Sequence, residues 1–442
     1  MSSRPNILWI VTTQWRAQAC GYAGDPNART PRLDALAAES VNYTQAVTPH
    51  PMGPQARAAL LTGRLCPDNG VRDYWDPLPP TARTLAHELR ERGYRTAFFG
   101  KWHLHERDRS VPFVGEAHAK IIVPSERRGG FEFWEGFEGG FLLNDPWLHG
   151  TRLPVPTRFK GYQSDVLCGR AAEWVARGQE ARCEMQEEAE RLEKRESRKS
   201  EIKYASPWFC VVSLESPHPP YGAPAAGVAP RDPREIVLPP NVPLGGAVER
   251  TAREELAGYY AHLEATDQAV GRLVDAVKLA ESHEGARPSL VVFTSVHGDM
   301  HGAHGLFRKA WPYEESVRVP LLVRLPACEK REARSGMREE AVSLVDLRAM
   351  TLAWSEGRTP AGEDRMGQAL ISMPTGSSIP LQCPHAWCGV RTRTRKLILK
   401  DDGTPWLFFD LESDPLELKN LSADATRRHE LADLQGNLSP NG

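Results

Sequence analysis

Basic and polar side chains follow directly after several short apolar runs of this sequence. Lys101 and His103 follow one run, His218 follows a second, and Val296-His297 follow a third. If these runs are strands of a parallel sheet, their carboxyl ends meet at one edge, where such sheets bind ligands. Imidazoles exchange protons near neutral pH, and lysine ammonium groups pair with anions. The spacing therefore predicts a ligand site at this edge.

The elements that would position these residues alternate between buried strands and helices. Apolar runs predict strands at 6–11, 96–99, 208–213, 289–294 and 320–324. Helical spacing of apolar residues predicts helices at 31–39, 84–92 and 253–278. Such alternation is typical of an α/β fold with a mostly parallel sheet flanked by helices.

The composition is that of an ordinary globular protein. The chain has 442 residues, 40% of them hydrophobic, and a formal net charge of −2, so no global field favours nucleic acid or an anionic membrane. No run reaches the roughly 18 apolar residues that span a bilayer. The apolar run at 7–11 predicts a strand, not a signal peptide. Together with eight scattered cysteines, expected to be reduced, this predicts a cytoplasmic protein.

Two segments differ from the rest in composition. Residues from about 178 to 203 are rich in Glu, Lys and Arg, with pairs such as Glu187 and Arg191 four apart. We expect a charged helical insertion in a domain covering 1–375. A thin stripe of apolar residues in this segment leaves open the alternative that the helix binds a partner protein.

The second segment, 376–442, is expected to form a C-terminal α+β subdomain. Strand patterns occur at 389–392, 396–399 and 407–410, with a hairpin signal at Asp401-Asp402-Gly403 and a helical pattern at 427–434. These predict a small antiparallel sheet with a terminal helix.

A series of short motifs runs in order along the chain. They are PNIL at 5–8, TPRLDALA at 30–37, MGPQARAALLTG at 52–63, GKWHL at 100–104, SPHPPY at 216–221, HGDM at 297–300 and FDLESDP at 409–415. In type and order they resemble the motifs of the sulfatases, within the alkaline phosphatase-like superfamily. The resemblance implies that family's α/β sandwich fold. It also implies an ancestral reaction, sulfate-ester hydrolysis by a formylglycine and a divalent cation, typically calcium.

The resemblance also implies roles for five basic residues. Lys101, His103, His218 and Lys309 stand where the family keeps its sulfate-binding and acid–base residues. Arg57 stands where the family's arginine assists the formylglycine. Cations at these places would stabilise charge on the sulfuryl oxygens.

The nucleophile position departs from the family pattern. In Cys-x-Pro-x-Arg the cysteine becomes formylglycine, but here Met52 stands at the cysteine position. One additional residue also separates Pro54 from Arg57. If the gap for the additional residue is placed elsewhere in the alignment, Gly53 falls at the cysteine position instead of Met52. Neither alignment therefore puts Cys, Ser or Thr at the nucleophile position.

The family's calcium positions depart in the same way. The pair after the first strand is Thr13-Gln14, and the later pair is Val296-His297. Calcium prefers several carboxylate and carbonyl oxygens, and none of these four residues is a carboxylate. We expect the chain not to bind calcium there, and we predict no cofactor.

Three functions are compatible with this pattern. The first is an impaired or inactive sulfatase relative that binds a small anionic ligand: sulfate, phosphate, or a sulfated sugar or aryl compound. The second is a sulfuric-ester or phosphoester hydrolase with altered nucleophile and metal use, in which His103 or His218 activates water. The third is an interaction protein that uses the charged insertion. The sequence does not determine the oligomeric state.

Overall fold

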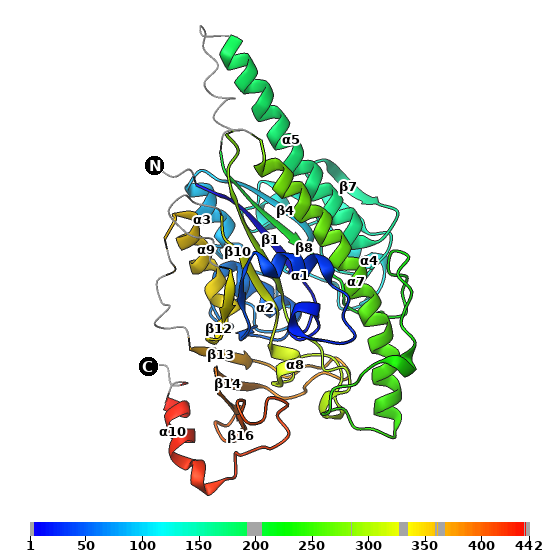
Figure 1. Ribbon diagram of the computed structural model, residues 1–442, viewed down its shortest axis with the longest axis vertical. Helices are drawn as coiled ribbons and strands as arrows, with labels where there is room; N and C mark the ends of the chain where they lie inside the picture. Colours follow the sequence, from blue (N-terminus) through cyan, green and yellow to red (C-terminus); the bar gives the residue numbers. More distant parts are fainter. Residues whose placement is uncertain are drawn as a thin grey trace.

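A ten-stranded mixed sheet forms the centre of the protein, seen in a computed structural model (Figure 1). The structure describes residues 4–191, 206–283, 285–326, 335–358, 360, 367–436 and 438, with 179–191 described as backbone alone. The strand order is β11-β2-β10-β9-β1-β8-β4-β5-β6-β7. The strands are β1 (Asn6–Thr12), β2 (Val41–Tyr43), β4 (Arg95–Lys101), β5 (Phe133–Phe137), β6 (Trp147–Gly150), β7 (Leu153–Arg158), β8 (Trp208–Ser213), β9 (Ser289–Ser295), β10 (Leu321–Arg324) and β11 (Gly336–Arg338).

The middle of this sheet is parallel. Strand β1 pairs in parallel with both β8 and β9, and β4 pairs in parallel with β8 and β5. Strand β10 runs antiparallel to β9. The mostly parallel sheet expected from the sequence is therefore confirmed, and the carboxyl ends of β9, β1, β8 and β4 lie side by side.

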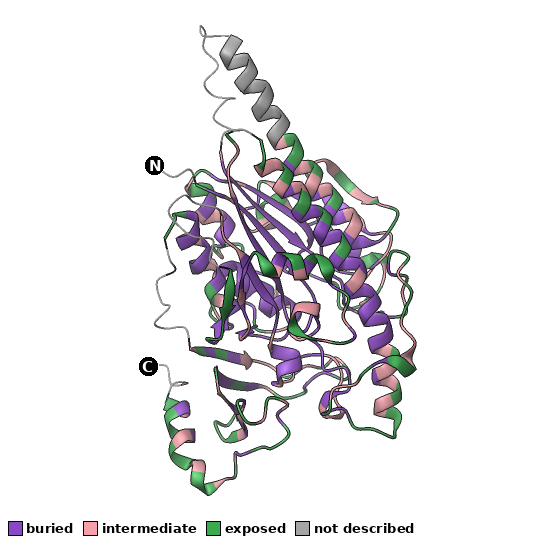
Figure 2. Cartoon of the chain, in the orientation of Figure 1, coloured by how far each residue is buried: buried purple, intermediate pink, exposed green. Residues whose placement is uncertain are grey.

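Helices cover both faces of the sheet (Figure 1). One face carries α2 (Gly53–Thr62), α3 (Leu85–Glu91) and α9 (Leu347–Ser355), and the other carries α1 (Pro31–Ala38), α5 (Gln163–Arg191) and α7 (Ala247–Glu281). Successive residues of β1 point to opposite faces, so Trp9 packs in the first core and Leu8 in the second. Figure 2 shows the sheet buried between these layers.

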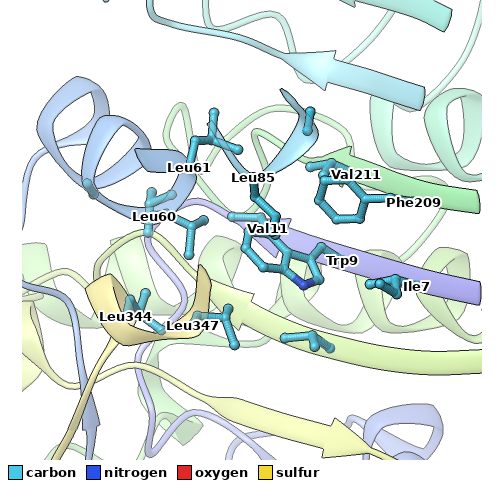
Figure 3. Close-up of a cluster of buried hydrophobic side chains, with 14 of the residues drawn as sticks. Ile7, Trp9, Val11, Leu60, Leu61, Leu85, Phe209, Val211, Leu344 and Leu347 are labelled. Carbon is cyan, nitrogen blue, oxygen red and sulfur yellow. The ribbon is translucent and has the colours of Figure 1, made fainter. Parts of the chain in front are cut away.

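The first core surrounds Trp9 (Figure 3). Leu60 and Leu61 of α2, Leu347 of α9 and Phe209 of β8 belong to the same buried cluster. Trp9 and Phe209 meet edge to face, with ring centroids 5.4 Å apart. This packing attaches α2, which carries the Arg57 motif, to the centre of the sheet.

A second, antiparallel sheet lies at the C-terminal end of the molecule (Figure 1). Its order is β13 (Gln368–Met373), β14 (Trp387–Thr392), β15 (Arg395–Lys400) and β16 (Pro405–Asp410), followed by α10 (Arg428–Gly436). Shorter elements complete the described fold: β3 (Ala46–Val47), β12 (Val342–Ser343), α4 (Glu116–Ala119) and α8 (Glu314–Val317). The expected small sheet with its helix is confirmed. Strand β13 joins it from before residue 376, and the domain boundary stays a prediction.

The charged insertion lies largely outside the described residues. Helix α5 extends to Arg191, so its backbone continues into the predicted segment. The side chains of that segment are not among those described, and the partner-binding alternative stays a prediction. None of the helices in the described ranges is long and apolar enough to cross a membrane.

Candidate functional site

The sheet brings the sequence-predicted site residues to one edge. Seven of them lie at or just after the carboxyl ends of four adjacent strands, as expected for ligand sites of parallel sheets. They are Thr13 and Gln14 after β1, Lys101 and His103 at the end of β4, His218 after β8, and Val296 and His297 after β9. Arg57 joins them from α2, and Lys309 from the loop before α8.

Lys101 is paired with a buried carboxylate. Its Nζ lies 2.5 Å from Oε1 of Glu215, and both side chains are almost fully buried. Gln163 of α5 donates from Nε2 to the other Glu215 oxygen, at 3.2 Å. Burial lowers the pKa of Lys101 to about 8, although Glu215 acts in the opposite direction. Sequence analysis missed Glu215. Its position two residues after β8 was the available signal.

Lys309 bridges two of the other predicted residues. Its Nζ donates to Oε1 of Gln14 at 2.8 Å and contacts Nε2 of His218 at 3.1 Å. The His218 Nδ1 faces the carbonyl of Pro219 at 2.8 Å, which leaves Nε2 as the acceptor for Lys309. Burial lowers the pKa of Lys309 to about 7.

A carboxylate that sequence analysis missed holds Gln14 in place. Asp299 accepts hydrogen bonds from Nε2 of Gln14 and, at 2.8 Å, from the hydroxyl of Tyr221. Backbone N–H groups of His301 and Arg308 donate to its other oxygen. Burial alone would raise the pKa of Asp299, but His301, Arg308 and Tyr221 outweigh it and lower the pKa to about 2. The sequence signal that could have identified Asp299 was its position two residues after His297.

Gly53, not Met52, faces the basic residues from the start of α2. A Cβ atom at Gly53 would lie 2.9 Å from Nδ1 of His103 and 3.3 Å from an Arg57 guanidinium nitrogen. The Met52 side chain is buried in an apolar cluster with Val47 and Tyr74. Gly53 stands four residues before Arg57, the same interval as from Cys to Arg in Cys-x-Pro-x-Arg.

Two buried imidazole nitrogens near this place have no hydrogen-bond partner. They are Nδ1 of His103, which faces the Gly53 position, and Nε2 of His297. The backbone of His103 adopts φ 59° and that of Gln14 φ 68°, a left-handed conformation that non-glycine residues rarely adopt. Strain of this kind concentrates at functional sites.

Three basic and two acidic side chains described here carry charge at the site. Arg57, Lys101 and Lys309 are basic, whereas Glu215 and Asp299 are acidic, which leaves the cluster cationic when both lysines are protonated. Burial and the neighbouring Lys101, Arg57 and Lys309 charges hold the pKa of His103 well below its usual value. The pKa values of the His218 and His297 imidazoles are also well below normal, chiefly because both are buried, so these groups are neutral at pH 7.

The four residues at the calcium positions do not fit a hard divalent cation. Thr13 Oγ1 accepts a hydrogen bond from Arg57 at 2.9 Å, and the Gln14 carbonyl oxygen accepts one from Lys309 at 2.8 Å. Val296 is fully buried in the first core. The two oxygens that remain at these positions therefore face cationic side chains, and Asp299 alone adds a carboxylate beside them.

Sequence comparison identifies the class of protein. The fold is that of the alkaline phosphatase-like α/β proteins. The chain belongs to the sulfatase family, whose sequence model matches residues 5–357. It is 33% identical to the ulvan-active sulfatase of Formosa agariphila, over 95% of this chain and 77% of that protein. It is 25% identical to the choline-sulfatase of Rhizobium meliloti, over 95% and 83%.

Solved structures share the fold. The Bacteroides fragilis protein yidJ superposes with a TM-score of 0.78 at 23% identity, covering 98% of this chain and 94% of that one. The phosphonate monoester hydrolase of Agrobacterium radiobacter superposes with a TM-score of 0.68 at 20% identity, covering 98% and 95%. The fold class expected from the sequence is thus confirmed.

Proposed function

We propose that this protein binds the sulfate-ester group of a sulfated sugar among the basic residues at the carboxyl edge of its sheet. It does so without the formylglycine and calcium of its family, so that the ancestral hydrolysis is impaired or lost. The observation that carries this proposal is a group of three buried basic residues, Arg57, Lys101 and Lys309, each close enough to His103 to lower its pKa electrostatically. Arg57 and His103 lie beside the side-chain-free position of Gly53.

The arrangement suits an oxyanion for several reasons. The three cationic side chains come from different elements, and each electrostatically lowers the pKa of His103, which supports their convergence on one place. Helix α2 begins at Gly53, so its positive end lies at the pocket. A bound sulfuryl oxygen would give the unpartnered Nδ1 of His103 a hydrogen-bond partner when that nitrogen carries the imidazole proton.

The ligand class follows from chemistry and from relatives. A sulfate ester carries one negative charge and several acceptor oxygens, which match lysine and arginine donors. The relative with the highest identity quoted above is named as acting on ulvan. We therefore expect a sulfated sugar to bind more tightly than inorganic sulfate, because the sugar ring adds contacts.

Calorimetry tests the binding. Sulfate, phosphate, an aryl sulfate and a sulfated oligosaccharide are titrated into wild type, Lys101→Ala and Lys309→Ala. We expect wild type to bind the sulfated ligands and either alanine variant to lose about tenfold or more, since each removes a charge-assisted hydrogen bond. Lys278→Ala, on the outer surface of α7 and paired with Glu39, is the matched control.

Absence of heat for every anion in wild type would contradict the proposal. Equal binding by wild type and both pocket variants would also contradict it, because the anion would then bind elsewhere. Thermal denaturation of each variant with and without sulfate provides an independent readout, since a ligand that binds only the folded state raises Tm.

A second candidate function is hydrolysis with water as the nucleophile. The unpartnered Nδ1 of His103 faces the space beside Gly53, and the lowered pKa of His103 keeps the imidazole neutral, which also makes it a weaker base. A water molecule in that space could be deprotonated by His103 while Arg57 and Lys309 stabilise charge on the ester oxygens. The structural likeness to a phosphonate monoester hydrolase adds phosphonate esters to the substrates worth testing.

Assays with aryl sulfate, aryl phosphate and aryl phosphonate esters distinguish the two candidates. They are run with EDTA and with added calcium, manganese or zinc. Turnover that is lost in His103→Gln but retained in Lys278→Ala would favour the hydrolase. No turnover under any condition, together with sulfate binding, favours the binding protein.

A further inference from the structure

A second group of metal-ligand side chains lies outside the pocket described above. His304, Glu315 and Glu417 each place one ligand atom within 4.8 Å of the other two. They come from the loop after β9, from α8 and from the segment after β16. Ligand atoms around one zinc ion lie at most about 4 Å apart, so modest side-chain movements would complete a site.

Glu315 is a buried carboxylate without a basic partner. It is 4% exposed, its Oε1 accepts a hydrogen bond from Asn241 at 2.7 Å, and its Oε2 has no partner. Among the described residues, no lysine or arginine forms an ion pair with it. Burying an uncompensated carboxylate is costly, so a bound cation would relieve a large penalty.

The nearby basic residues are already engaged. Lys396 pairs with Glu417 and, at 3.1 Å, with Glu314, while Arg391 pairs with Glu314 at 3.0 Å. Glu417 also accepts from the backbone N–H of Glu314, at 2.8 Å. These contacts engage Glu314 and Glu417, whereas Glu315 forms no ion pair among the described residues and interacts only electrostatically with the buried Arg16.

Asn241 provides an independent indication of a ligand at this place. It is 5% exposed, and its Nδ2 contacts both Glu315 and Nε2 of His304, so its amide faces the cluster. Its Oδ1 is buried and has no partner. Rotating the amide by half a turn exchanges the two atoms and directs Oδ1 at the cluster, as a fourth ligand.

The geometry points to a divalent transition-metal site formed by His304, Glu315, Glu417 and Asn241. Imidazole combined with carboxylates suits zinc better than calcium, which prefers oxygen ligands alone. The ion would join the loop after β9 to the segment after β16, and so would tie the large sheet to the C-terminal sheet. This site is separate from the family's calcium position and from the anion pocket.

Zinc titration of the full chain tests the proposal. After treatment with EDTA and dialysis, zinc chloride is titrated by calorimetry, bound zinc is measured by elemental analysis, and Tm is recorded with and without zinc. We expect one zinc ion per chain and a zinc-dependent rise in Tm. In Glu315→Gln and His304→Ala, zinc affinity should fall more than about tenfold. His283→Ala removes an exposed histidine and is the matched control.

Glu315→Gln separates a metal site from an ion-pair network. Because glutamine removes the charge but can keep the hydrogen bond from Asn241, the EDTA-treated variant should remain folded, yet gain no stability from zinc. Asn241→Asp adds a negative ligand, so it should bind zinc more tightly and be less stable in EDTA. Failure of wild type to bind zinc would overturn the proposal, as would zinc binding that survives in both Glu315→Gln and His304→Ala.

Discussion

At the scale of single residues, the direction of a Cβ atom distinguishes two alignments that the sequence leaves open. Met52 and Gly53 are both candidates for the nucleophile position when only letters are counted. In the fold, Met52 packs among apolar side chains, whereas a Cβ at Gly53 would point at His103 and Arg57. The geometry therefore supports Gly53 as the place where the family's formylglycine would stand.

This difference gives a first prediction. Met52→Cys, produced with a formylglycine-generating enzyme, should show no aryl-sulfate turnover, because position 52 faces the apolar cluster.

Gly53→Cys combined with Gln55→Pro recreates Cys-x-Pro-x-Arg ending at Arg57. Only this double variant should carry an aldehyde beside Arg57, detected by hydrazide labelling of the folded protein. It should still lack calcium-dependent turnover, because Thr13, Gln14 and Val296 remain. Aryl-sulfate turnover by Met52→Cys alone would contradict this assignment.

At the scale of elements, a polar residue inside an apolar helix face has a structural explanation. Asp267 interrupts the apolar pattern of α7, and the sequence offers no reason for it. In the fold its carboxylate accepts hydrogen bonds from the backbone N–H groups of Arg32 and Leu33, at 3.1 and 2.8 Å. It thereby satisfies the first turn of α1, whose N–H groups have no partner within the helix.

Helix α7 also controls the position of Tyr221, which gives a second prediction. A Cβ at Gly258 would lie 2.0 Å from the carbonyl oxygen of Tyr221. Gly258→Ala must therefore move α7 away from the loop that contains Tyr221, whose hydroxyl donates to Asp299. We expect the free energy of unfolding to fall by about 1–3 kcal/mol, and sulfate affinity to fall with it. Gly169→Ala in α5, where nothing lies within 4 Å, should stabilise the protein by about 0.5–1 kcal/mol.

Urea unfolding monitored by circular dichroism measures both changes. Because both variants make the same chemical change within long helices, the comparison isolates the close approach at Gly258. If Gly258→Ala were as stable as Gly169→Ala, that result would contradict the close packing of α7 against the Tyr221 loop.

At the scale of the whole molecule, buried neutral histidines determine how stability responds to acid. Burial lowers the pKa of His50, His149 and His262 to about 4 each. None of them belongs to the anion pocket. Three buried carboxyl groups act in the opposite direction: burial raises the pKa of Glu138 to about 7, that of Asp267 to about 6 and that of Glu417 to about 8.

The third prediction follows from these shifts. Between pH 6.5 and 4 the unfolded chain takes up a proton on each of the three histidines and the folded chain does not, so acidification lowers stability. Each histidine contributes up to about 1.4 kcal/mol per pH unit. The three carboxyl groups favour the folded state as the pH falls towards 4.5. They are outnumbered because the pKa values of three further buried histidines, His103, His218 and His297, are also lowered. Stability should therefore be fully present above pH 6.5 and fall towards pH 4.

One substitution isolates a single histidine. His149 accepts a hydrogen bond from the backbone N–H of Val123 at 2.8 Å, which a glutamine carbonyl can also accept. In His149→Gln the slope of unfolding free energy against pH, measured by urea unfolding, should decrease by about one proton. The exposed His283→Gln variant controls for substitution itself. An unchanged slope in His149→Gln would contradict the prediction.

The sequence by itself determined the family, the α/β class and the order of the central strands along the chain. Short apolar runs report burial on both faces, which is why the expected strands at 6–11, 208–213 and 289–294 agree with β1, β8 and β9 to within a residue. It also located Lys101, His103 and His218, because residues at strand ends are fixed in place by the strands before them.

Only the tertiary structure decided which groups compensate or orient these residues. Glu215 and Asp299 are distant in sequence from Lys101 and Gln14, and no local pattern links the members of either pair. The choice between Met52 and Gly53 likewise depended on how α2 packs against the sheet. Contacts of this kind arise when separate strands end at the same edge, and the chain's linear order does not contain that information.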